Sequence, residues 1–426
     1  MKKRSLAEWL DYQQRVHPRS IELGLDRVSE VWRRMGQPRP APLVITVGGT
    51  NGKGSTVAFL EAILAAYGKR AGAYTSPHLL RYNERVRVAG VDSGDATLVG
   101  AFERIEAARA DIPLTYFEFG TLAALWIFSQ SGIDVALLEV GLGGRLDAVN
   151  IIDADVALVT SIDLDHQDWL GNDRDSIGGE KAGIFRAGRP AIIGTDEPPA
   201  GLLTEAARIG AIVSRAGRDF HALRGESGWQ WRSAGVIVDL PWPALAAPCQ
   251  VDNAAAAIMA LHELRERIGW NPRALADGVR SARASARLQR LPVSGRAEVI
   301  VDVAHNPQAA RMLAQWLASS PAAGRTLAVF GALDDKDVAG IVAPLLDQVD
   351  QWLLAGLDGL TSRGLAATSL HARVRAAAPS AAASVHDDPR AALAAARSLA
   401  RPDDRIVAFG SFYVAAEVLA AMDAPG

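Results

Sequence analysis

Short apolar runs alternate with longer helical patterns over residues 42–195 of the chain. LVITV, VALLEV and VALVTSI are apolar almost throughout, and segments with helical periodicity separate them. A strand that is apolar on both faces belongs in a parallel sheet that helices cover on both sides. The alternation therefore predicts a doubly covered α/β domain, whose ligands bind beyond the carboxyl ends of its strands.

The alternation stops near residue 215 and restarts near residue 286. Residues 215–250 contain tryptophans and proline-bounded runs, which predict a small β excursion, and a helix is expected from near Asn253. Strand-like runs then alternate with helices again to the end of the chain. We predict two domains, residues 1–285 and residues 286–426, with a hinge in residues 281–295.

Length and composition fit this organisation. A chain of 426 residues is too long for one ordinary core. Its net charge of −3 argues against a general affinity for nucleic acid or anionic membranes. The single cysteine, Cys249, excludes an intramolecular disulfide and a cysteine-based zinc site, which favours a reducing cytoplasm. The N-terminus predicts an amphipathic helix, because charged residues interrupt it too early for a signal peptide or membrane span.

The stretch GGTNGKGST follows the first apolar run and opens a helical pattern. Its glycines allow backbone N–H groups to approach an anion closely, and Lys53 adds a positive charge for terminal phosphates. Ser55 or Thr56 could reach a magnesium ion. A tight turn whose glycines only relieve crowding is the alternative. Gly54, between Lys53 and Ser55, argues against an ordinary P-loop kinase and for a relative that binds phosphate in the same way.

Polar side chains also follow two further apolar runs. Glu139 lies in VALLEV, and His166 follows VALVTSI in DLDHQDW. Because parallel strands end at the same edge of a sheet, we expect both residues to lie near the glycine loop. Each has a structural alternative: Glu139 could cap the next turn, and an isolated histidine is more often a hydrogen-bonded structural residue than a metal ligand.

Long blocks of the sequence closely resemble folylpolyglutamate synthase, especially the bacterial bifunctional dihydrofolate synthase/folylpolyglutamate synthase, in the Mur ligase superfamily. The blocks are GTNGKGST, YTSPHLLRYNERVRV, TYFEFGTLAALWIF, LEVGLGGRLDAVN, SIDLDHQDWLG, EKAGIF, DVAHNP and FGSFYVAAEV. The resemblance implies a large P-loop-type ATPase domain with a pteroate pocket in residues 1–285. It implies a smaller Rossmann-like glutamate ligase domain in residues 286–426.

The implied activity is that of an ATP-dependent acid–amino-acid ligase. A carboxylate takes the γ-phosphoryl group of ATP to form an acyl phosphate, and the amine of L-glutamate then displaces phosphate. The acid substrates are dihydropteroate, which gives dihydrofolate, and reduced folates such as tetrahydrofolate, which receive γ-linked glutamates. The block LGGRLDA favours both activities, and folylpolyglutamate synthase activity alone is the alternative.

The resemblance also implies two Mg²⁺ ions. The implied metal ligands are Ser76, Glu139, His166 and Lys181, the last as a carbamate, and the implied catalytic residues are Lys53, Glu139, His166 and Lys181. From the sequence alone, Ser76 is an ordinary turn residue and Lys181 is an exposed helix lysine. A cationic lysine would be repelled by magnesium, whereas a neutral amine can take up CO₂ and become an anion.

Substrate-binding residues are implied in both domains. For ATP they are Thr50, Asn51, Gly52, Lys53, Gly54, Ser55, Thr56, Asn253, Arg287, Asp302 and His305. For the pteroate or folate they are Ile21, Glu22, Leu23, Thr115, Tyr116, Phe117, Glu118, Leu146, Asp147 and Ala148. Asp302 could instead cap a helix and Asp147 could form a turn, and Leu122, Leu125 and Ile127 are assigned to the core.

One segment departs from the family pattern. The family usually has Pro-Gly-Arg-Phe before the second domain, whereas this chain has Ser-Ala-Arg-Leu at residues 285–288. Arg283 or Arg290 could therefore substitute for Arg287 in binding ATP. Because residues of both domains are implied for one nucleotide, we also predict that the domains close over ATP.

Three other classes of protein are alternatives to a folate ligase. A small-molecule P-loop kinase would not need the second α/β domain, and a Mur ligase acting on a cell-wall precursor should carry a further N-terminal domain. An ATP-gated binding protein without catalysis should lack the metal ligands. We expect a cytoplasmic monomer that binds neither nucleic acid nor a membrane.

Overall fold

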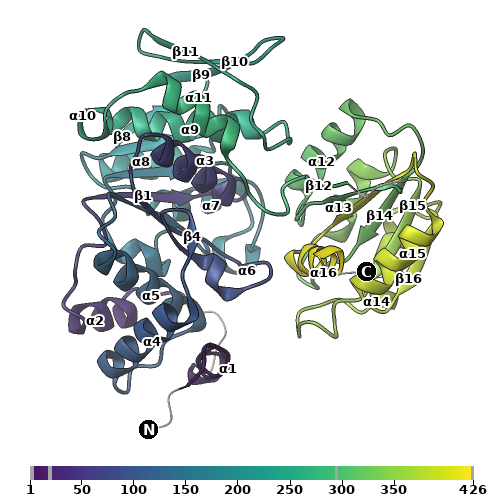
Figure 1. Cartoon of the computed structure of the whole chain (residues 1–426), viewed down its shortest axis with the longest axis horizontal. Coiled ribbons are helices and arrows are strands. Elements are labelled where there is room, and N and C mark those ends of the chain that lie inside the picture. The colour runs from purple at the N-terminus through teal and green to yellow at the C-terminus, as the bar shows by residue number, and fades with distance from the viewer. Residues whose placement is uncertain (1–3, 18–21, 293–295, 424–426) are drawn as a thin grey trace. The chain divides into compact units, whose positions relative to one another are not determined.

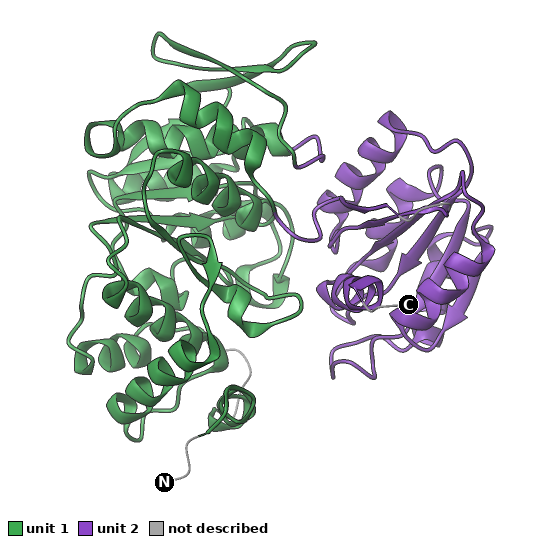
Figure 2. Ribbon diagram, in the orientation of Figure 1, with its two compact units in different colours: residues 1–244, 250–283 green, residues 245–249, 284–426 purple. Residues whose placement is uncertain are grey.

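The computed structural model describes residues 4–17, 22–292 and 296–423. The chain divides into two compact units, shown in Figure 2. Unit 1 comprises residues 1–244 and 250–283, and unit 2 comprises residues 245–249 and 284–426. Each unit has its own sheet, and each is described by itself.

Unit 1 is built on an eight-stranded sheet in the order β4-β3-β2-β5-β1-β6-β7-β8 (Figure 1). The six strands from β2 to β8 in that order run parallel, whereas β3 and β4 are antiparallel to their neighbours. The strands are β1 (Leu43–Gly48), β2 (Ala71–Tyr74), β3 (Val86–Val88), β4 (Val91–Asp92), β5 (Val135–Glu139), β6 (Val156–Val159), β7 (Pro190–Ile193) and β8 (Ile212–Arg215). Every residue of β1 is buried, as its unbroken apolar run predicts.

Helices cover both faces of this sheet (Figure 1). One face packs against α1 (Leu6–Val16), α2 (Asp26–Arg34), α4 (Asp95–Arg109), α5 (Tyr116–Gln130), α7 (Arg174–Ala182) and α8 (Ala200–Ile209). The other packs against α3 (Lys53–Ala66), α9 (Gln250–Glu263) and α11 (Pro272–Ser281). Shorter helices are η1 (Tyr82–Arg85), η2 (Ala148–Ile151), α6 (Gln167–Leu170) and α10 (Arg265–Ile268). Leu122, Leu125 and Ile127 of α5 are buried in the core, as predicted.

The predicted β excursion is a small antiparallel sheet of three strands. It contains β9 (Phe220–Arg224), β10 (Trp229–Ser233) and β11 (Val236–Leu240). Trp231 of β10 is buried, and its indole Nε1 donates to the carbonyl oxygen of Ala255 in α9, 3.1 Å away. This bond anchors the small sheet on a helix that begins at Gln250, three residues before the predicted start.

Unit 2 is a second α/β body with a six-stranded sheet in the order β12-β13-β17-β14-β15-β16. Its strands are β12 (Gln289–Leu291), β13 (Glu298–Val301), β14 (Thr326–Phe330), β15 (Gln351–Ala355), β16 (Ala383–His386) and β17 (Arg405–Phe409), and only β12 is antiparallel to its neighbour within this sheet. Its helices are α12 (Pro307–Ser319), α13 (Val338–Val342), η3 (Ala343–Leu345), α14 (Ala367–Ala377), α15 (Pro389–Leu399) and α16 (Phe412–Asp423).

The rings of Phe330, Trp352 and Phe409 pack together in the core of unit 2, with centroids 5.1–6.2 Å apart. The mostly parallel sheet of unit 1, its β excursion and the second α/β unit confirm the predicted fold class. Among the helices of the described residues, none combines the length and the apolar character needed to span a membrane.

Candidate active site

The glycine loop joins the end of β1 to the start of α3. Gly49 and Gly52 have φ angles of +139° and +89°, which L side chains rarely adopt. A Cβ on Gly49 would lie 1.9 Å from Thr160 Oγ1, and one on Gly52 would lie 2.5 Å from Asn253 Oδ1. Thr160 Oγ1 also donates to Asn51 O, 2.6 Å away. The loop is therefore held against the end of β6, and two of its glycines are required by sterics.

Replacing Gly49 with alanine should lower the free energy of unfolding by about 2–4 kcal/mol, because the new Cβ would collide with Thr160 and the backbone would be strained. Urea unfolding would measure the loss. Gly68→Ala is the matched control, since Gly68 also has a positive φ, +73°, but has open space around it. Equal losses in the two variants would contradict the collision with Thr160.

Two lysine ammonium groups meet at this loop. Lys53 Nζ donates to Gly49 O (3.0 Å) and to Thr50 O (3.2 Å). Lys181 Nζ, from α7, donates to the same Gly49 oxygen, also at 3.0 Å. Two like charges bound to one carbonyl oxygen disfavour the charged form of whichever is more buried.

Lys181 is the more deeply placed of the two, with 4% of its surface exposed. Burial first, and the charge of Lys53 second, lower the pKa of Lys181 to about 7, although Asp165 and Asp147 act in the opposite direction. The expectation from the sequence alone, an exposed helix lysine, is wrong. The loop around Gly144 lies so close to α7 that a Cβ there would be 2.9 Å from Lys181 O, and this tertiary contact covers the helix.

Ser76 and Glu139 lie at the ends of neighbouring strands, β2 and β5. The backbone N–H of Ser76 donates to Glu139 Oε2, 3.1 Å away, and Glu139 is 4% exposed. His166 follows β6 and begins α6 with a left-handed backbone, φ +51°. Because β2, β5, β1 and β6 are adjacent in the sheet, all three residues and the glycine loop lie at or just after the carboxyl ends of consecutive strands.

The predicted metal ligands differ from an ordinary site for Mg²⁺, which prefers oxygen ligands. Within the described parts of the chain, no group of three His, Cys, Asp or Glu side chains is arranged to hold a metal ion. The predicted set contributes one carboxylate, one imidazole, one hydroxyl and Lys181. These residues fit a magnesium site if the amine of Lys181 is converted to an anion.

The two hydroxyls after Gly54 have different surroundings. Ser55 Oγ accepts a hydrogen bond from Gln250 Nε2, 3.2 Å away, which ties α3 to α9. Thr56 is fully buried, and its Oγ1 has no hydrogen-bond partner among the described residues. Both hydroxyls therefore belong to residues that are buried in the protein.

The structure brings together the three segments predicted to bind the pteroate, except for Ile21, which lies outside the described residues. Arg27 donates to Glu22 Oε1 (2.6 Å) and to Glu118 Oε1 (3.2 Å), joining the first segment to α5. Gly24 N donates to Leu146 O (3.3 Å), joining the first segment to the third. Arg27 was missed by the sequence analysis.

Asp147 has a clear structural role in this pocket region. It accepts hydrogen bonds from the backbone N–H groups of Gly141, Leu142 and Val149, so it forms the turn. Burial raises its pKa to about 6, although these bonds oppose the rise. The ring of Phe117 lies against Gly141, where a Cβ would be 2.5 Å away from the ring.

In unit 2, Asp302 follows β13 and accepts hydrogen bonds from the backbone N–H groups of Leu288 and Ala304, both at 2.8 Å. It does not cap a helix: the N-cap of α12 is Asn306, whose side chain accepts from Ala309 N. Burial raises the pKa of Asp302, and the nearby charge of Arg287 opposes this. The alternative reading of Asp302 as a helix cap is therefore wrong.

The three candidate arginines differ in their surroundings. The Arg287 guanidinium lies 5.6 Å from the ring centroid of Phe412, and the ring of His305 is 5.9 Å from the same ring. Among the described residues, Arg283 donates only to carbonyl oxygens, those of Arg280 and Ala282. Ala286, where the family usually has glycine, is buried with φ +53°. Arg287 is thus the arginine placed beside Asp302.

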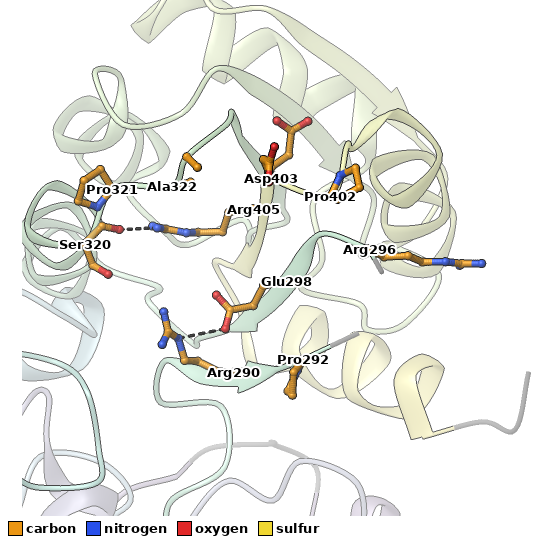
Figure 3. A pocket seen from close by; sticks show the side chains of 12 residues that line it. Arg290, Pro292, Arg296, Glu298, Ser320, Pro321, Ala322, Pro402, Asp403 and Arg405 are labelled. Atoms are coloured by element: carbon orange, nitrogen blue, oxygen red, sulfur yellow. Dashed lines mark hydrogen bonds and ion pairs between the residues drawn. The ribbon is translucent and has the colours of Figure 1, made fainter. Parts of the chain in front are cut away.

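Arg290 instead lines a cavity of about 400 Å³ near the start of β13 and β17 (Figure 3). Its side chain pairs with Glu298, 3.1 Å away, and Arg405 donates to Ser320 O in the same cavity. Asp302 follows the opposite end of β13. The cavity therefore does not include the residues predicted to bind ATP.

Comparison with protein families decides the assignment of the chain. Residues 47–261 match the Mur ligase middle domain, and residues 286–412 match the Mur ligase glutamate ligase domain. The chain belongs to the Mur ligase family. Within it, the chain is 46% identical over 420 residues to the dihydrofolate synthase/folylpolyglutamate synthase of Escherichia coli K12, covering 98% of this chain and 96% of that protein. The resemblance found in the sequence is confirmed.

Two solved structures of Mur ligases of this type are similar to this chain over nearly its whole length. E. coli FolC in complex with DHPP and ADP is 45% identical, with a TM-score of 0.92, covering 99% of this chain and 98% of that one. A bifunctional folylpolyglutamate synthase/dihydrofolate synthase with Mn, AMPPNP and L-glutamate bound is 44% identical, with a TM-score of 0.90 and coverages of 99% and 98%. Both units of the chain therefore have counterparts in these relatives.

Proposed function

We propose that this chain is an ATP-dependent ligase that joins L-glutamate to dihydropteroate and adds γ-linked glutamates to reduced folates. One observation carries the proposal: the similarity to dihydrofolate synthase/folylpolyglutamate synthase extends over nearly the whole chain. A kinase of small molecules would not require the glutamate ligase domain. Residence in the cytoplasm as a monomer is part of the same proposal.

The glycine loop and Lys53 would bind the phosphates of ATP. The backbone N–H groups of Gly52 and the first turn of α3 lie at a helix N-terminus, which favours an anion. Lys53 Nζ now binds carbonyl oxygens of the loop itself, so its charge is already at the place where phosphates would arrive. Asn253, beside Gly52, is suited to contact the same nucleotide. Nucleotide contacts by Arg287, Asp302 and His305 stay a prediction.

Ser76, Glu139 and His166 would hold Mg²⁺, since they supply oxygen and imidazole donors at adjacent strand ends. When bound, the metal would neutralise the charges of the phosphates and of the carboxylate that meets them. The chain's own contribution is to fix these donors, because Glu139 is buried and is oriented by the N–H of Ser76.

Lys181 would complete this set as a carbamate. Its neutral amine nitrogen attacks the carbon of CO₂ and one proton leaves to solvent, so the uncharged amine becomes a carbamate with one negative charge. Burial and the shared Gly49 oxygen support the proposal, because both disfavour a second ammonium beside Lys53. Carbon-13 NMR of the folded enzyme in ¹³C-labelled bicarbonate should show a carbamate signal that Lys181→Met lacks, and identical spectra of the two proteins would contradict the carbamate.

An assay of purified protein with ATP, Mg²⁺ and glutamate tests the function. We expect orthophosphate to be released only when both an acid and glutamate are present, with dihydropteroate and with tetrahydrofolate. Activity on tetrahydrofolate alone would remove the synthase half of the proposal, and a phosphorylated stable product would indicate a kinase. An ¹⁸O label in the substrate carboxylate should appear in the phosphate, because the acyl phosphate passes that oxygen to phosphorus.

A further inference from the structure

Arg85, at the end of η1, lies among aromatic rings with 8% of its surface exposed. Its guanidinium carbon is 5.4 Å from the ring centroid of Tyr82 and 5.4 Å from that of Tyr116. Its Nε donates to His78 Nδ1, 2.8 Å away. Its two terminal amino groups, Nη1 and Nη2, have no hydrogen-bond partner among the described residues.

The acidic groups near Arg85 in the sequence are engaged elsewhere. Both carboxylate oxygens of Glu84 accept hydrogen bonds from backbone N–H groups, those of Leu79, Leu80 and Arg81. Arg87, two residues on, has its own acid, Glu61, at 3.0 Å. No carboxylate of the described residues lies within the 4.0 Å of an ion pair with Arg85.

A cation that is only 8% exposed and has no anion beside it is unfavourable, because the charge has lost much of its hydration. The two tyrosine rings offset part of this cost through their cation–π contacts with the guanidinium. Arg27 shows the usual solution: it contacts the carboxylates of both Glu22 and Glu118. Arg85 therefore lacks the acidic partner that Arg27 has. An anion from outside the chain could serve as that partner.

Arg85 also lies between two parts of the candidate site. Tyr116, whose ring it contacts, belongs to the segment predicted to bind the pteroate. The carbonyl oxygen of Arg85 accepts from the N–H of Thr75, 3.0 Å away, and the next residue, Ser76, is bonded to Glu139. A second polar group in this cluster is unsatisfied, since Tyr82 Oη is buried without a partner among the described residues.

We propose that Arg85 binds a carboxylate of the acid substrate through Nη1 and Nη2. The planar guanidinium presents parallel N–H groups that match the two oxygens of a carboxylate. This inference rests on the proposed function, because it takes the acid to be of the pteroate type. Arg85 would then select an acid with a free carboxylate over a neutral pterin derivative of the same shape.

The test compares dihydropteroate with its carboxamide, which has the same shape but no charge. Wild-type protein with ADP and Mg²⁺ should bind the acid about 10-fold or more tightly than the amide, as expected for charge-assisted hydrogen bonds. Arg85→Met should remove this preference while leaving the dissociation constant of the amide within about 2-fold. Arg85→Lys, which keeps the charge but loses the planar pair of donors, should retain an intermediate preference.

Each other outcome contradicts the proposal in a recognisable way. Equal weakening of both ligands in Arg85→Met and in Arg85→Lys would mean that Arg85 only supports the fold of the pocket. An unchanged preference would mean that it does not contact the carboxylate. If wild-type protein bound neither ligand, the proposed substrate class would fail and this inference with it. Arg81→Met is the matched control: Arg81 is in the same loop but exposed, and the preference for the acid should persist.

Discussion

Replacing Lys181 with methionine should abolish ligase turnover and at the same time stabilise the folded chain. Turnover should fall by about 10³-fold or more, because the anionic ligand that neutralises charge at the metal site would be lost. The gain in stability has a separate cause. In wild-type protein without CO₂, folding buries an amine beside Lys53, whereas methionine buries no charge.

The pH dependence of unfolding distinguishes these effects. The pKa of Lys181 is about 7 in the folded chain and near its ordinary value of 10.5 when unfolded, so between these values the unfolded chain binds more protons. Wild-type stability should therefore rise with pH in this window, by at most about 1.4 kcal/mol per pH unit, relative to Lys181→Met. The advantage of the variant should be largest below pH 7 and should vanish near pH 10.5.

Urea unfolding of both proteins at several pH values, in bicarbonate-free buffer, measures this difference. Lys69→Met is the control, because Lys69 is only partly buried, near the end of α3, and its loss should not change the slope. Identical slopes for wild type and Lys181→Met would contradict the burial of a neutral amine.

Acetate or propionate should restore part of the activity of Lys181→Ala if the missing group is an anion.

Much of the candidate site could be predicted because it follows from one rule of parallel sheets. The glycine loop and the segment with His166 follow apolar runs, and Glu139 lies at the end of one; runs of that type belong to buried strands whose carboxyl ends lie at one edge. The sequence cannot give the order of the strands. The adjacency of β2, β5, β1 and β6, which places Ser76 beside Glu139, comes from the fold.

Residues whose role depends on distant packing could not be predicted. Lys181 has the local pattern of an exposed helix residue and is buried by loops from elsewhere in unit 1. Gln250 contacts Ser55 across 195 positions of sequence, and Arg27 joins two segments 96 residues apart, from Glu22 to Glu118. Asp302 has the residue type of a helix cap, but the N-cap is Asn306, because α12 begins at Pro307. In each case the partner is set by tertiary structure.

Replacing Glu139 with glutamine should lower kcat/KM by about 10³-fold with little loss of stability. Glutamine has nearly the same shape, and its side-chain oxygen can still accept the hydrogen bond from Ser76 N, so the loop before η1 should keep its position. What disappears is the negative charge at the end of β5. If that charge holds a cation, the variant should bind Mg²⁺ more weakly. A higher concentration of Mg²⁺ should then be needed for the half-maximal rate.

Activation curves with Mg²⁺ and with Mn²⁺ would test this assignment, and thermal unfolding would confirm that the variant is folded. Glu103→Gln, an exposed acid on α4, is the control and should leave both the curves and the rate unchanged. If Glu139→Gln lost activity but kept the wild-type dependence on Mg²⁺, the assignment of the carboxylate as a metal ligand would be contradicted. A metal-binding Glu139 also predicts a clearly smaller loss for Ser76→Ala, which keeps its backbone N–H, because a neutral hydroxyl contributes less to binding a divalent cation than a carboxylate does.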